Sequence, residues 1–372
     1  MSALPGPLPP LYARWMDELL AAPIPNESRA TCNDCAMWSK PGSDAPDQPP
    51  PVAFRRDTKC CTFQPELHNF LLGAILDDPD RGLAWAKEMI AMRLLRRTGV
   101  TPLGIRPDAF AGLLYDRIVD GAHETFGRLR EVRCPYYIEQ GGKCGVWRHR
   151  NAMCSTWFCK YERGAVGKTF WKTQLALLRA AERALALWCV LELDLGIAAK
   201  TTLLYVQNRD SGSARDLVEP VPEHGYQALW GSYVGRELEL YRSCARLVAG
   251  LGWADVRRIA GPELALLEDV VKEQYAALVS DALPTAVQRG RETLLQVHPT
   301  KPDHYRAIAP NLGYDPLDLP AKILTLLPEV VGRDLGEALA TLHASGRGTE
   351  LDESSVRTLL DYGVLAPSRA PA

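Results

Sequence analysis

Eight cysteines lie in the first 160 residues of this 372-residue chain, and their thiolates are ligands that zinc and iron accept. They fall into two groups: the first reads C-x2-C, then 24 residues and an adjacent pair, and the second reads C-x9-C-x9-C-x4-C. The eight are Cys32, Cys35, Cys60, Cys61, Cys134, Cys144, Cys154 and Cys159. Because C-x2-C places two sulfurs on one centre, the pattern predicts a metal site built from these thiols.

The spacing of the cysteines favours an iron–sulfur centre over zinc. His68, His123 and His149 do not form the short-spaced pair that a zinc finger with two cysteines and two histidines needs. Zinc ribbons join one C-x2-C to another, and the second group lacks that unit. Irregular spacings suit a cluster whose irons sit at separate corners. We therefore expect one or two [4Fe-4S] clusters, with zinc as the alternative.

Cys60 and Cys61 are adjacent, which is unusual for ligands of one metal ion. Side chains of neighbouring residues diverge by roughly 180° along a strand or about 100° around a helix. We therefore expect this pair to face two centres, or two irons of one cluster, and we favour two centres. Cys189 and Cys244 lie in apolar helical patterns, where buried structural cysteines are common, so we exclude them from the site.

Four pieces of the cysteine-rich region carry a resemblance to a known family: CNDC (32–35), KCCTFQPELHNFL (59–71), CPYY (134–137) and GGKCGVWRHRNAMCSTWFC (141–159). Together they resemble the zinc- or iron-chelating cysteine-cluster proteins of the CxxCxxCC type, which include the flagellin lysine N-methylases. The resemblance covers about residues 30–170, and a Pro-rich segment here splits the compact family run. It implies an iron–sulfur transferase of the methyltransferase kind, which uses S-adenosylmethionine to modify an amine or a peptide side chain.

S-adenosylmethionine is expected to bind at the cluster, because the chain lacks a glycine-rich nucleotide loop. The nearest string, AGLGWAD at 249–255, has Asp255 where a third glycine is required and follows a helical pattern, not a strand. A [4Fe-4S] cluster with three thiolate ligands leaves one iron open to the amino and carboxylate groups of the methionine moiety. The CxxxCxxC motif of the radical type is absent, so that chemistry is not assigned.

Side chains beside the second cysteine group are the candidates for contacts with this cofactor: Trp147, Arg148, Arg150 and Tyr161. The guanidinium groups can bind a carboxylate or phosphate, or offset the negative charge of a thiolate-ligated cluster. The aromatic rings can stack on adenine, or shield the cluster from water. His68 and Glu66 follow the adjacent cysteines and are candidates for a ligand or for proton transfer, although polar packing is the simpler interpretation. No catalytic residue is assigned.

Two other functions stay open: an iron–sulfur protein for redox or electron transfer, and a zinc-stabilised scaffold. An electron carrier rarely needs a further helical half-chain, which favours an enzyme with a protein, peptide or small-amine substrate. Net charge is -2, so we expect no nucleic-acid partner. The N-terminus lacks signal-peptide features, and the longest apolar run contains Glu192 and Asp194. We therefore expect a cytoplasmic protein that does not contact the membrane.

The elements that must position these residues are mostly helices. Apolar periodicity predicts them over 11–22, 83–97, 108–119, 169–195, 226–250 and 262–281, and another beginning near Pro65. Residues 131–161 show no long period and are expected to form turns and short pieces. The C-terminal stretch predicts helix, helix, turn, helix and a short strand.

We therefore predict a mainly α protein with three parts. Residues 1–168 form an irregular cysteine-rich metal-binding domain, packed on a helical domain over 169–315. Residues 316–372 form a small winged-helix-like module. Its final helix, SSVRTLLDYG, carries no stripe of Lys and Arg, so packing or protein docking is favoured over DNA binding.

Overall fold

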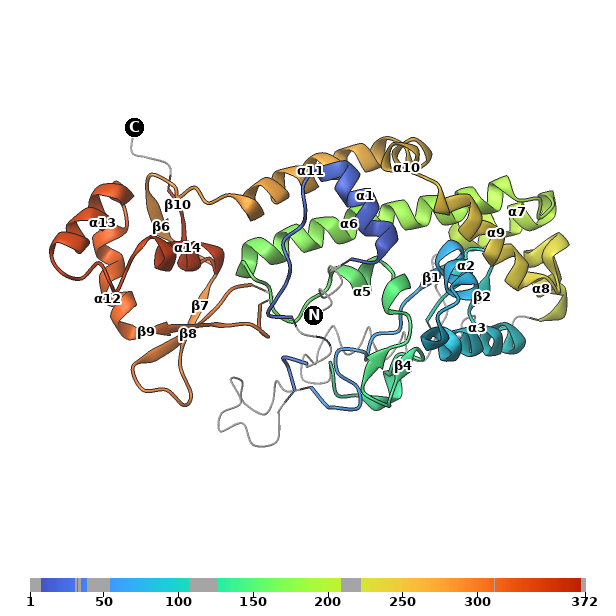
Figure 1. Cartoon of the computed structure of the whole chain (residues 1–372), viewed down its shortest axis with the longest axis horizontal. Helices are drawn as coiled ribbons and strands as arrows, with labels where there is room; N and C mark the ends of the chain where they lie inside the picture. The colour runs from blue at the N-terminus through green and yellow to red at the C-terminus, as the bar shows by residue number, and fades with distance from the viewer. Residues whose placement is uncertain are drawn as a thin grey trace. The chain divides into compact units, whose positions relative to one another are not determined.

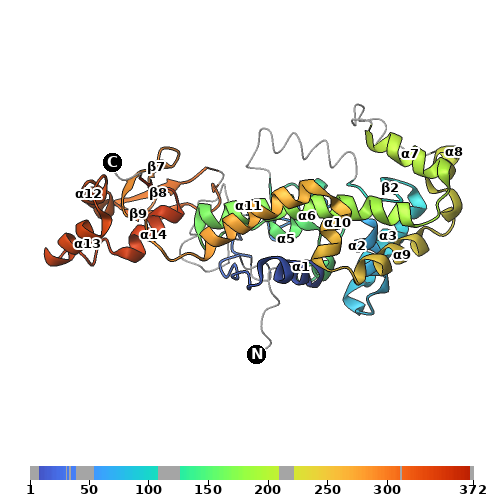
Figure 2. The same cartoon turned by 90° about the horizontal axis from the view of Figure 1, so that it is seen from above.

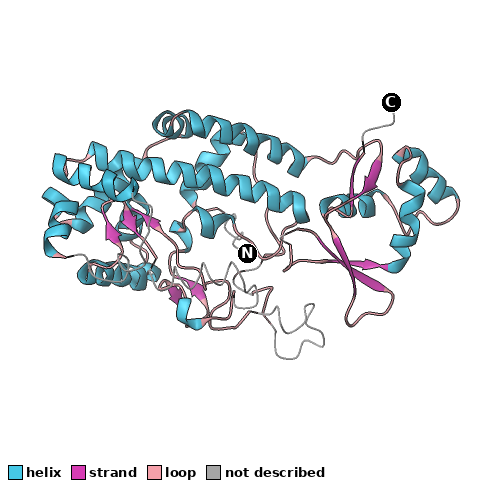
Figure 3. Cartoon of the chain, turned by 180° about the vertical axis from the view of Figure 1, so that it is seen from behind, coloured by secondary structure: helices cyan, strands magenta, loops and turns pink. Residues whose placement is uncertain are grey.

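A computed structural model describes residues 8–30, 32, 35–38, 54–107, 126–208, 222–310 and 312–368 (Figure 1). The fold is mainly α, as predicted: about 53% of the residues are helical and the sheets are small (Figure 3). The helix predicted over 108–119 and the Pro-rich segment after Cys35 lie outside the described residues.

The chain divides into two compact units, and each consists of separate stretches of sequence. The first unit comprises Met1–Ile24, Cys32–Trp157 and Gln174–Asp269. The second comprises Pro25–Thr31, Phe158–Thr173 and Val270–Ala372. Each unit is described by itself below.

Helices dominate the first unit. Those predicted over 11–22, 83–97, 169–195 and 262–281 are confirmed, the stretch 226–250 contains two helices, and the helix expected near Pro65 begins at Asn69, after a short strand. The longer helices of the unit are α1 (Pro10–Leu20), α2 (Asn69–Asp77), α3 (Ala84–Arg96), α7 (Ile197–Asn208), α8 (Glu223–Trp230), α9 (Glu237–Ala249) and α10 (Trp253–Ala260), with most of α6 (Gly164–Glu192) and part of α11 (Pro262–Val279). Cys189 in α6 and Cys244 in α9 are fully buried, and the Cys189 thiol lies 3.7 Å from the Cys244 carbonyl oxygen. Both therefore serve as small core residues, as expected from their apolar surroundings.

Helices α2 and α9 pack closely against each other (Figures 1 and 2). Gly73 of α2 makes this approach possible. A β-carbon added to Gly73 would lie 1.9 Å from the carbonyl oxygen of Tyr241 and 2.7 Å from the β-carbon of Ala245. The missing side chain therefore sets the separation of the two helices.

We expect Gly73→Ala to lower the free energy of unfolding by about 1–3 kcal/mol, because α9 must move to make room for the methyl group. The measurement is chemical denaturation of the full chain. Gly250→Ala is the matched control, since no atom lies within 4 Å of its added β-carbon. Equal stability of the two variants would contradict this account of the helix crossing.

Short elements make up much of the rest of the unit, and over residues 131–156 they occur where the lack of periodicity predicted turns and short pieces. Strands β1 (Leu67–His68), β2 (Val100–Thr101) and β3 (Gly104–Ile105) form a sheet in the order β1-β3-β2. Strands β4 (Tyr137–Ile138) and β5 (Lys143–Cys144) form an antiparallel pair that aligns Tyr137 with Cys144. Short 3-10 helices, Arg130–Val132 and Trp147–His149, and helix α5 (Ala152–Thr156) complete the region.

The second unit combines two small sheets with three helices. Strands β7 (Leu294–Val297), β8 (His304–Ile308) and β9 (Leu317–Pro320) form an antiparallel sheet in that order, and β6 (Val287–Arg289) pairs with β10 (Leu365–Pro367). The helices are α12 (Ala321–Val330), α13 (Leu335–Ala344) and α14 (Glu353–Asp361). One hydrophobic core joins them, with Val287, Leu327 and Val356 fully or almost fully buried.

Two charged pairs hold the outlying stretches of this unit to its core. Arg29 donates to both carboxylate oxygens of the buried Asp315, at 2.6 and 3.1 Å, and the Tyr362 hydroxyl bonds to the same carboxylate. Arg163 pairs in the same two-pronged way with Asp361 at the end of α14. Bidentate geometry of this kind gives directional strength to a charged contact.

No helix in the described part of the chain combines the length and apolar character needed to cross a membrane.

Candidate metal centre

Seven of the eight predicted ligand cysteines belong to the first unit. Six of these have buried or half-buried side chains, and Cys32 is exposed. Cys159 belongs to the second unit, where its thiol lies within electrostatic range of the Tyr161 phenol. The site described below is therefore the one built by the seven cysteines of the first unit.

Cys60 and Cys61 lie in a series of turns, in neither a helix nor a strand. Lys59, just before them, has a φ of 50°, in the left-handed region that side-chain-bearing residues seldom adopt. The turn brings the two thiols into hydrogen-bond contact, which raises the pKa of Cys60. The expectation that their side chains diverge is wrong, because it assumed regular backbone geometry.

Backbone hydrogen bonds join the two cysteine groups. The amide of Cys134 donates to the carbonyl oxygen of Cys61 at 2.8 Å. The buried Lys59 ammonium donates to the carbonyl oxygens of Cys32, at 3.0 Å, and Gly142, at 2.7 Å. Since Gly142 lies in the turn before Cys144, one lysine holds the first C-x2-C against the β4–β5 hairpin.

Helix α5 places Cys154. Its N-cap is Asn151, whose side-chain oxygen accepts from the Cys154 amide at 3.0 Å. The amide group of the same side chain donates to the carbonyl oxygen of Glu66 at 3.0 Å, five residues beyond Cys61. Asn151 thus fixes the short helix to the chain that leaves the adjacent cysteines.

The thiols lie close enough to shift one another's pKa. The protein around Cys32 raises the pKa of its thiol to about 12 although the residue is exposed, and the Cys60 thiol adds to the shift. Burial raises the pKa of Cys134, with Cys144 and Cys154 as further causes. Burial also raises the pKa of Cys154, followed by Cys144. Metal-free, these thiols are neutral at pH 7, and a bound metal must displace their protons.

Arg150 is the positive charge among these thiols. Its side chain is 5% exposed, and the guanidinium donates to the carbonyl oxygens of Trp147, at 3.1 Å, and Cys154, at 3.3 Å. It also lies 3.5 Å from the centroid of the Trp147 ring. Burial lowers the pKa of Arg150, while the Cys144 and Cys32 thiols act to raise it. A buried guanidinium in such surroundings favours ionised thiolates.

We expect Arg150→Gln to weaken metal binding by about 10- to 100-fold, the usual cost of losing a group that supports metal ligands. Competition with a chelator measures this affinity. Arg148→Gln removes the same charge two residues away, where the side chain is exposed, and should retain metal as the unmodified protein does. Equal metal loss from both variants would show that only overall charge matters.

The chemistry of the donor set fits a thiolate-ligated centre. The thiols of Cys32, Cys60, Cys61, Cys134, Cys144 and Cys154 lie within electrostatic range of one another or of Arg150, and Cys35 lies within range of Cys32. The buried Arg150 guanidinium would balance the charge that ionised thiols carry. Among the described residues, no three Cys, His, Asp or Glu side chains are already placed around one point as ligands of a single ion. The thiols are thus gathered in one region without yet surrounding one point.

The other predicted cofactor contacts are only partly brought together. Trp147 and Arg150 stack within the cysteine region, whereas Arg148 is exposed near Asp78. Tyr161 belongs to the second unit and packs edge-on against Phe158.

His68 and Glu66 lie on either side of Leu67 and have different surroundings. His68 is buried, with its Nε2 atom 3.8 Å from a carboxylate oxygen of Glu182. Glu66 is half-buried, and its carboxylate lies 3.6 Å from the Arg106 guanidinium. Packing and ion pairing account for both.

Two residues that shape the site were not singled out from the sequence. Lys59 carries a signal in its position, directly before the adjacent cysteines. Glu182 carries none, because it is one glutamate in a long helical pattern and its partners are far away in sequence. It accepts hydrogen bonds from the Tyr12 hydroxyl and, at 2.8 Å, from the Ala152 amide at the start of α5.

Comparisons of the chain with protein-family models, with curated proteins and with solved structures found no match. The resemblance to the cysteine-cluster family stays a prediction from the four cysteine-bearing pieces of sequence.

Proposed function

We propose that the gathered cysteines bind an iron–sulfur centre, and that the chain is an enzyme which uses this centre with S-adenosylmethionine to modify an amine or a peptide side chain. The observation that carries the proposal is the gathering of thiols around the buried Arg150 guanidinium, which lies within electrostatic range of Cys32, Cys60, Cys144 and Cys154. Cys32, Cys35, Cys60, Cys61, Cys134, Cys144 and Cys154 would hold the metal, with Cys159 as a further candidate.

The balance of charge supports a thiolate-ligated centre. A thiolate-ligated cluster carries net negative charge, and both Arg150 and Lys59 are buried cations beside the cysteines. When bound, a [4Fe-4S] cluster with an open iron can hold the amino and carboxylate groups of S-adenosylmethionine. The chain itself gathers the cysteine ligands, excludes water with the Trp147 ring, and holds the Arg150 guanidinium beside the ligands.

The C-terminal elements support a second, smaller part of the proposal, a winged-helix-like module that docks a protein or peptide. An antiparallel sheet, β7–β9, precedes three helices, and a terminal strand follows them. The final helix, α14, contains one basic residue, Arg357, and its guanidinium donates to the Ser280 carbonyl oxygen at 2.8 Å. That arrangement gives α14 no row of cations for DNA phosphates.

Anaerobic purification followed by iron, zinc and sulfide analysis and an absorption spectrum tests the metal. Iron with acid-labile sulfide and a visible charge-transfer band is the expected result. Zinc alone, without that band, would overturn the iron–sulfur assignment and leave a zinc-stabilised scaffold.

The enzyme assignment has its own test. Adding S-adenosylmethionine to the reduced protein should shift the EPR signal of the cluster. An unchanged signal would argue against the transferase and favour a redox protein.

A further inference from the structure

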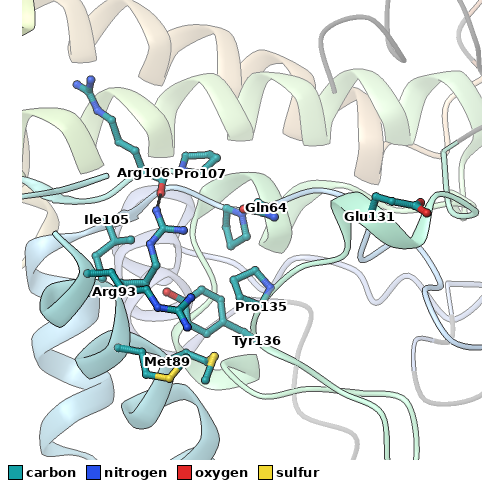
Figure 4. Close-up of a pocket in the computed structure, with 12 residues that line it drawn as sticks. Gln64, Met89, Arg93, Ile105, Arg106, Pro107, Glu131, Pro135 and Tyr136 are labelled. Atoms are coloured by element: carbon teal, nitrogen blue, oxygen red, sulfur yellow. Dashed lines mark hydrogen bonds between the residues drawn. The ribbon is translucent and has the colours of Figure 1, made fainter. Parts of the chain in front are cut away.

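A cavity of about 290 Å³ opens in the first unit beside the cysteine region (Figure 4). Four stretches of chain line it: one face of α3, residues 105–107 at the end of β3 and after it, residues 64–65 after Cys61, and the chain on both sides of Cys134. Small-molecule sites begin at about this size, and the volume is roughly that of ten water molecules. The cavity therefore suits a compact ligand.

The charge of the lining is positive. Arg93 and Arg96 contribute two guanidinium groups, against one carboxylate from Glu131. Figure 4 shows Glu131 apart from Arg93, and it shows the Arg106 side chain directed away from the other lining residues, with its carbonyl oxygen toward Arg93. Arginine is the side chain best suited to bind a planar carboxylate or a phosphate through paired hydrogen bonds.

The position of Arg93 is set in advance. Its Nε atom donates to the carbonyl oxygen of Thr98 at 2.9 Å, and a terminal nitrogen donates to that of Arg106 at 2.8 Å (Figure 4). A guanidinium held by backbone acceptors loses little conformational entropy when a ligand arrives. Arg96, by contrast, lies exposed at the end of α3, where it can move onto the ligand.

Most of the remaining wall is apolar and adaptable. Met89, Met92, Ile105 and Pro135 supply it with the ring of the buried Tyr136, and Gln64 adds a polar side chain. Methionine side chains adjust their shape to irregular ligands. The lining therefore matches a molecule with one anionic end and a short apolar body.

The cavity adjoins the thiols through two stretches of chain. Pro135 and Tyr136 directly follow Cys134, and the Tyr136 ring lies within electrostatic range of both the Cys134 thiol and the Arg93 guanidinium. Gln64 lies three residues after Cys61. A ligand in the cavity would thus sit beside the proposed metal centre.

We propose that this cavity binds a small organic oxyanion, with a carboxylate or phosphate group at the arginines and an apolar body against the methionines. Anion binding does not depend on the metal. Only the interpretation of the cavity as the substrate site rests on the proposed function.

Saturation-transfer NMR on the full chain tests the proposal with three probes: hexanoate, butyl phosphate and the uncharged 1-hexanol. At least one of the two anions should bind, and more tightly than 1-hexanol. The tighter anion identifies the group as carboxylate or phosphate. Binding of 1-hexanol as tightly as the anions, or no binding of either anion, would overturn the proposal.

Variants locate the site. Arg96→Gln should raise the Kd of the bound anion about tenfold or more. The Arg96 side chain is exposed, so the variant should fold as the unmodified protein does. Arg258→Gln removes the same charge from an exposed position on α10 and should leave the Kd unchanged. An unchanged Kd in the cavity variant would refute the assignment.

Cys134→Ser separates the two proposals. Retained anion binding after metal loss supports the cavity independently of the centre. If the unmodified protein contains no iron but binds the anion, only the proposed function fails.

Discussion

Cys134→Ser is expected to remove most of the metal from the protein. Cys134 donates its amide to the Cys61 carbonyl oxygen and lies within electrostatic range of Cys144 and Cys154, so its thiol stands where the two cysteine groups meet. A serine hydroxyl keeps the size of the side chain but is a poor ligand for soft metals. Iron and sulfide per chain, together with the visible absorption, measure the loss.

Cys189→Ser is the matched control for this change. Cys189 is fully buried, and its thiol faces the Cys244 carbonyl oxygen, to which a serine hydroxyl could also donate. Full metal content in Cys189→Ser, with little in Cys134→Ser, is the expected pair of results. Undiminished metal in Cys134→Ser would exclude this thiol from the centre.

Variants of the adjacent cysteines test whether the protein holds one metal centre or two. Because the Cys60 and Cys61 thiols contact each other, we now expect Cys60→Ser and Cys61→Ser to lose the same share of the metal, as ligands of one shared centre would. Different shares would instead favour two centres, the interpretation drawn from divergent side chains.

Glu182→Ala is expected to lower the free energy of unfolding by about 2–5 kcal/mol, because two buried donors each lose their acceptor at a cost of about 1–3 kcal/mol. The Glu182 side chain is 2% exposed and accepts from the Tyr12 hydroxyl and the Ala152 amide, with His68 3.8 Å away. Truncation leaves these polar groups buried without their acceptor. Chemical denaturation measures the change. Metal content should fall as well, because Ala152 begins the helix that carries Cys154.

Glu182→Gln provides the control and a pH test. Burial is the largest cause that raises the pKa of Glu182 above its ordinary value of 4.5. A group whose pKa is raised by folding stabilises the protein fully below its unfolded pKa, and this contribution is lost as pH rises through the folded pKa. Glutamine does not titrate, so stability should depend less on pH in this variant than in the unmodified protein. If the stability of Glu182→Gln and of the unmodified protein changed with pH in the same way, the pH dependence would come from groups other than Glu182.

Local periodicity was enough to predict the helices but not how they pack. The apolar residues around Phe70 and Leu71 predicted α2, because a helix repeats every 3.6 residues whatever it packs against. Gly73 lies in the same stretch and looks unremarkable in sequence, yet it sets the approach of α9. That role depends on Tyr241, which is 168 residues away.

The candidate site was predicted by residue type and not by geometry. Cysteine is uncommon, so eight in one region already indicate metal binding. The turn at Lys59 depends on a left-handed φ that this residue type seldom adopts, so no rule of sequence predicts it. The cavity was overlooked because its lining comes from α3 and from the chain after β3, which lie side by side only in the folded unit.

The hydrogen bonds of the Lys59 ammonium bear on whether the chain folds before or after it binds metal. The ammonium donates hydrogen bonds to the carbonyl oxygens of both Cys32 and Gly142. It thereby helps to close the loop between the first and the last cysteine of the first unit, Cys32 and Cys154, which are 122 residues apart in the chain. Closing a loop of that length costs about 4 kcal/mol of chain entropy, in addition to a constant. Folding supplies this closure through protein contacts alone. An incoming metal would then find the cysteines gathered in one folded region, where only local movement is needed to place them around one point. The substrate of a metal-delivery step would then be a folded apoprotein and not an unfolded chain that waits for metal.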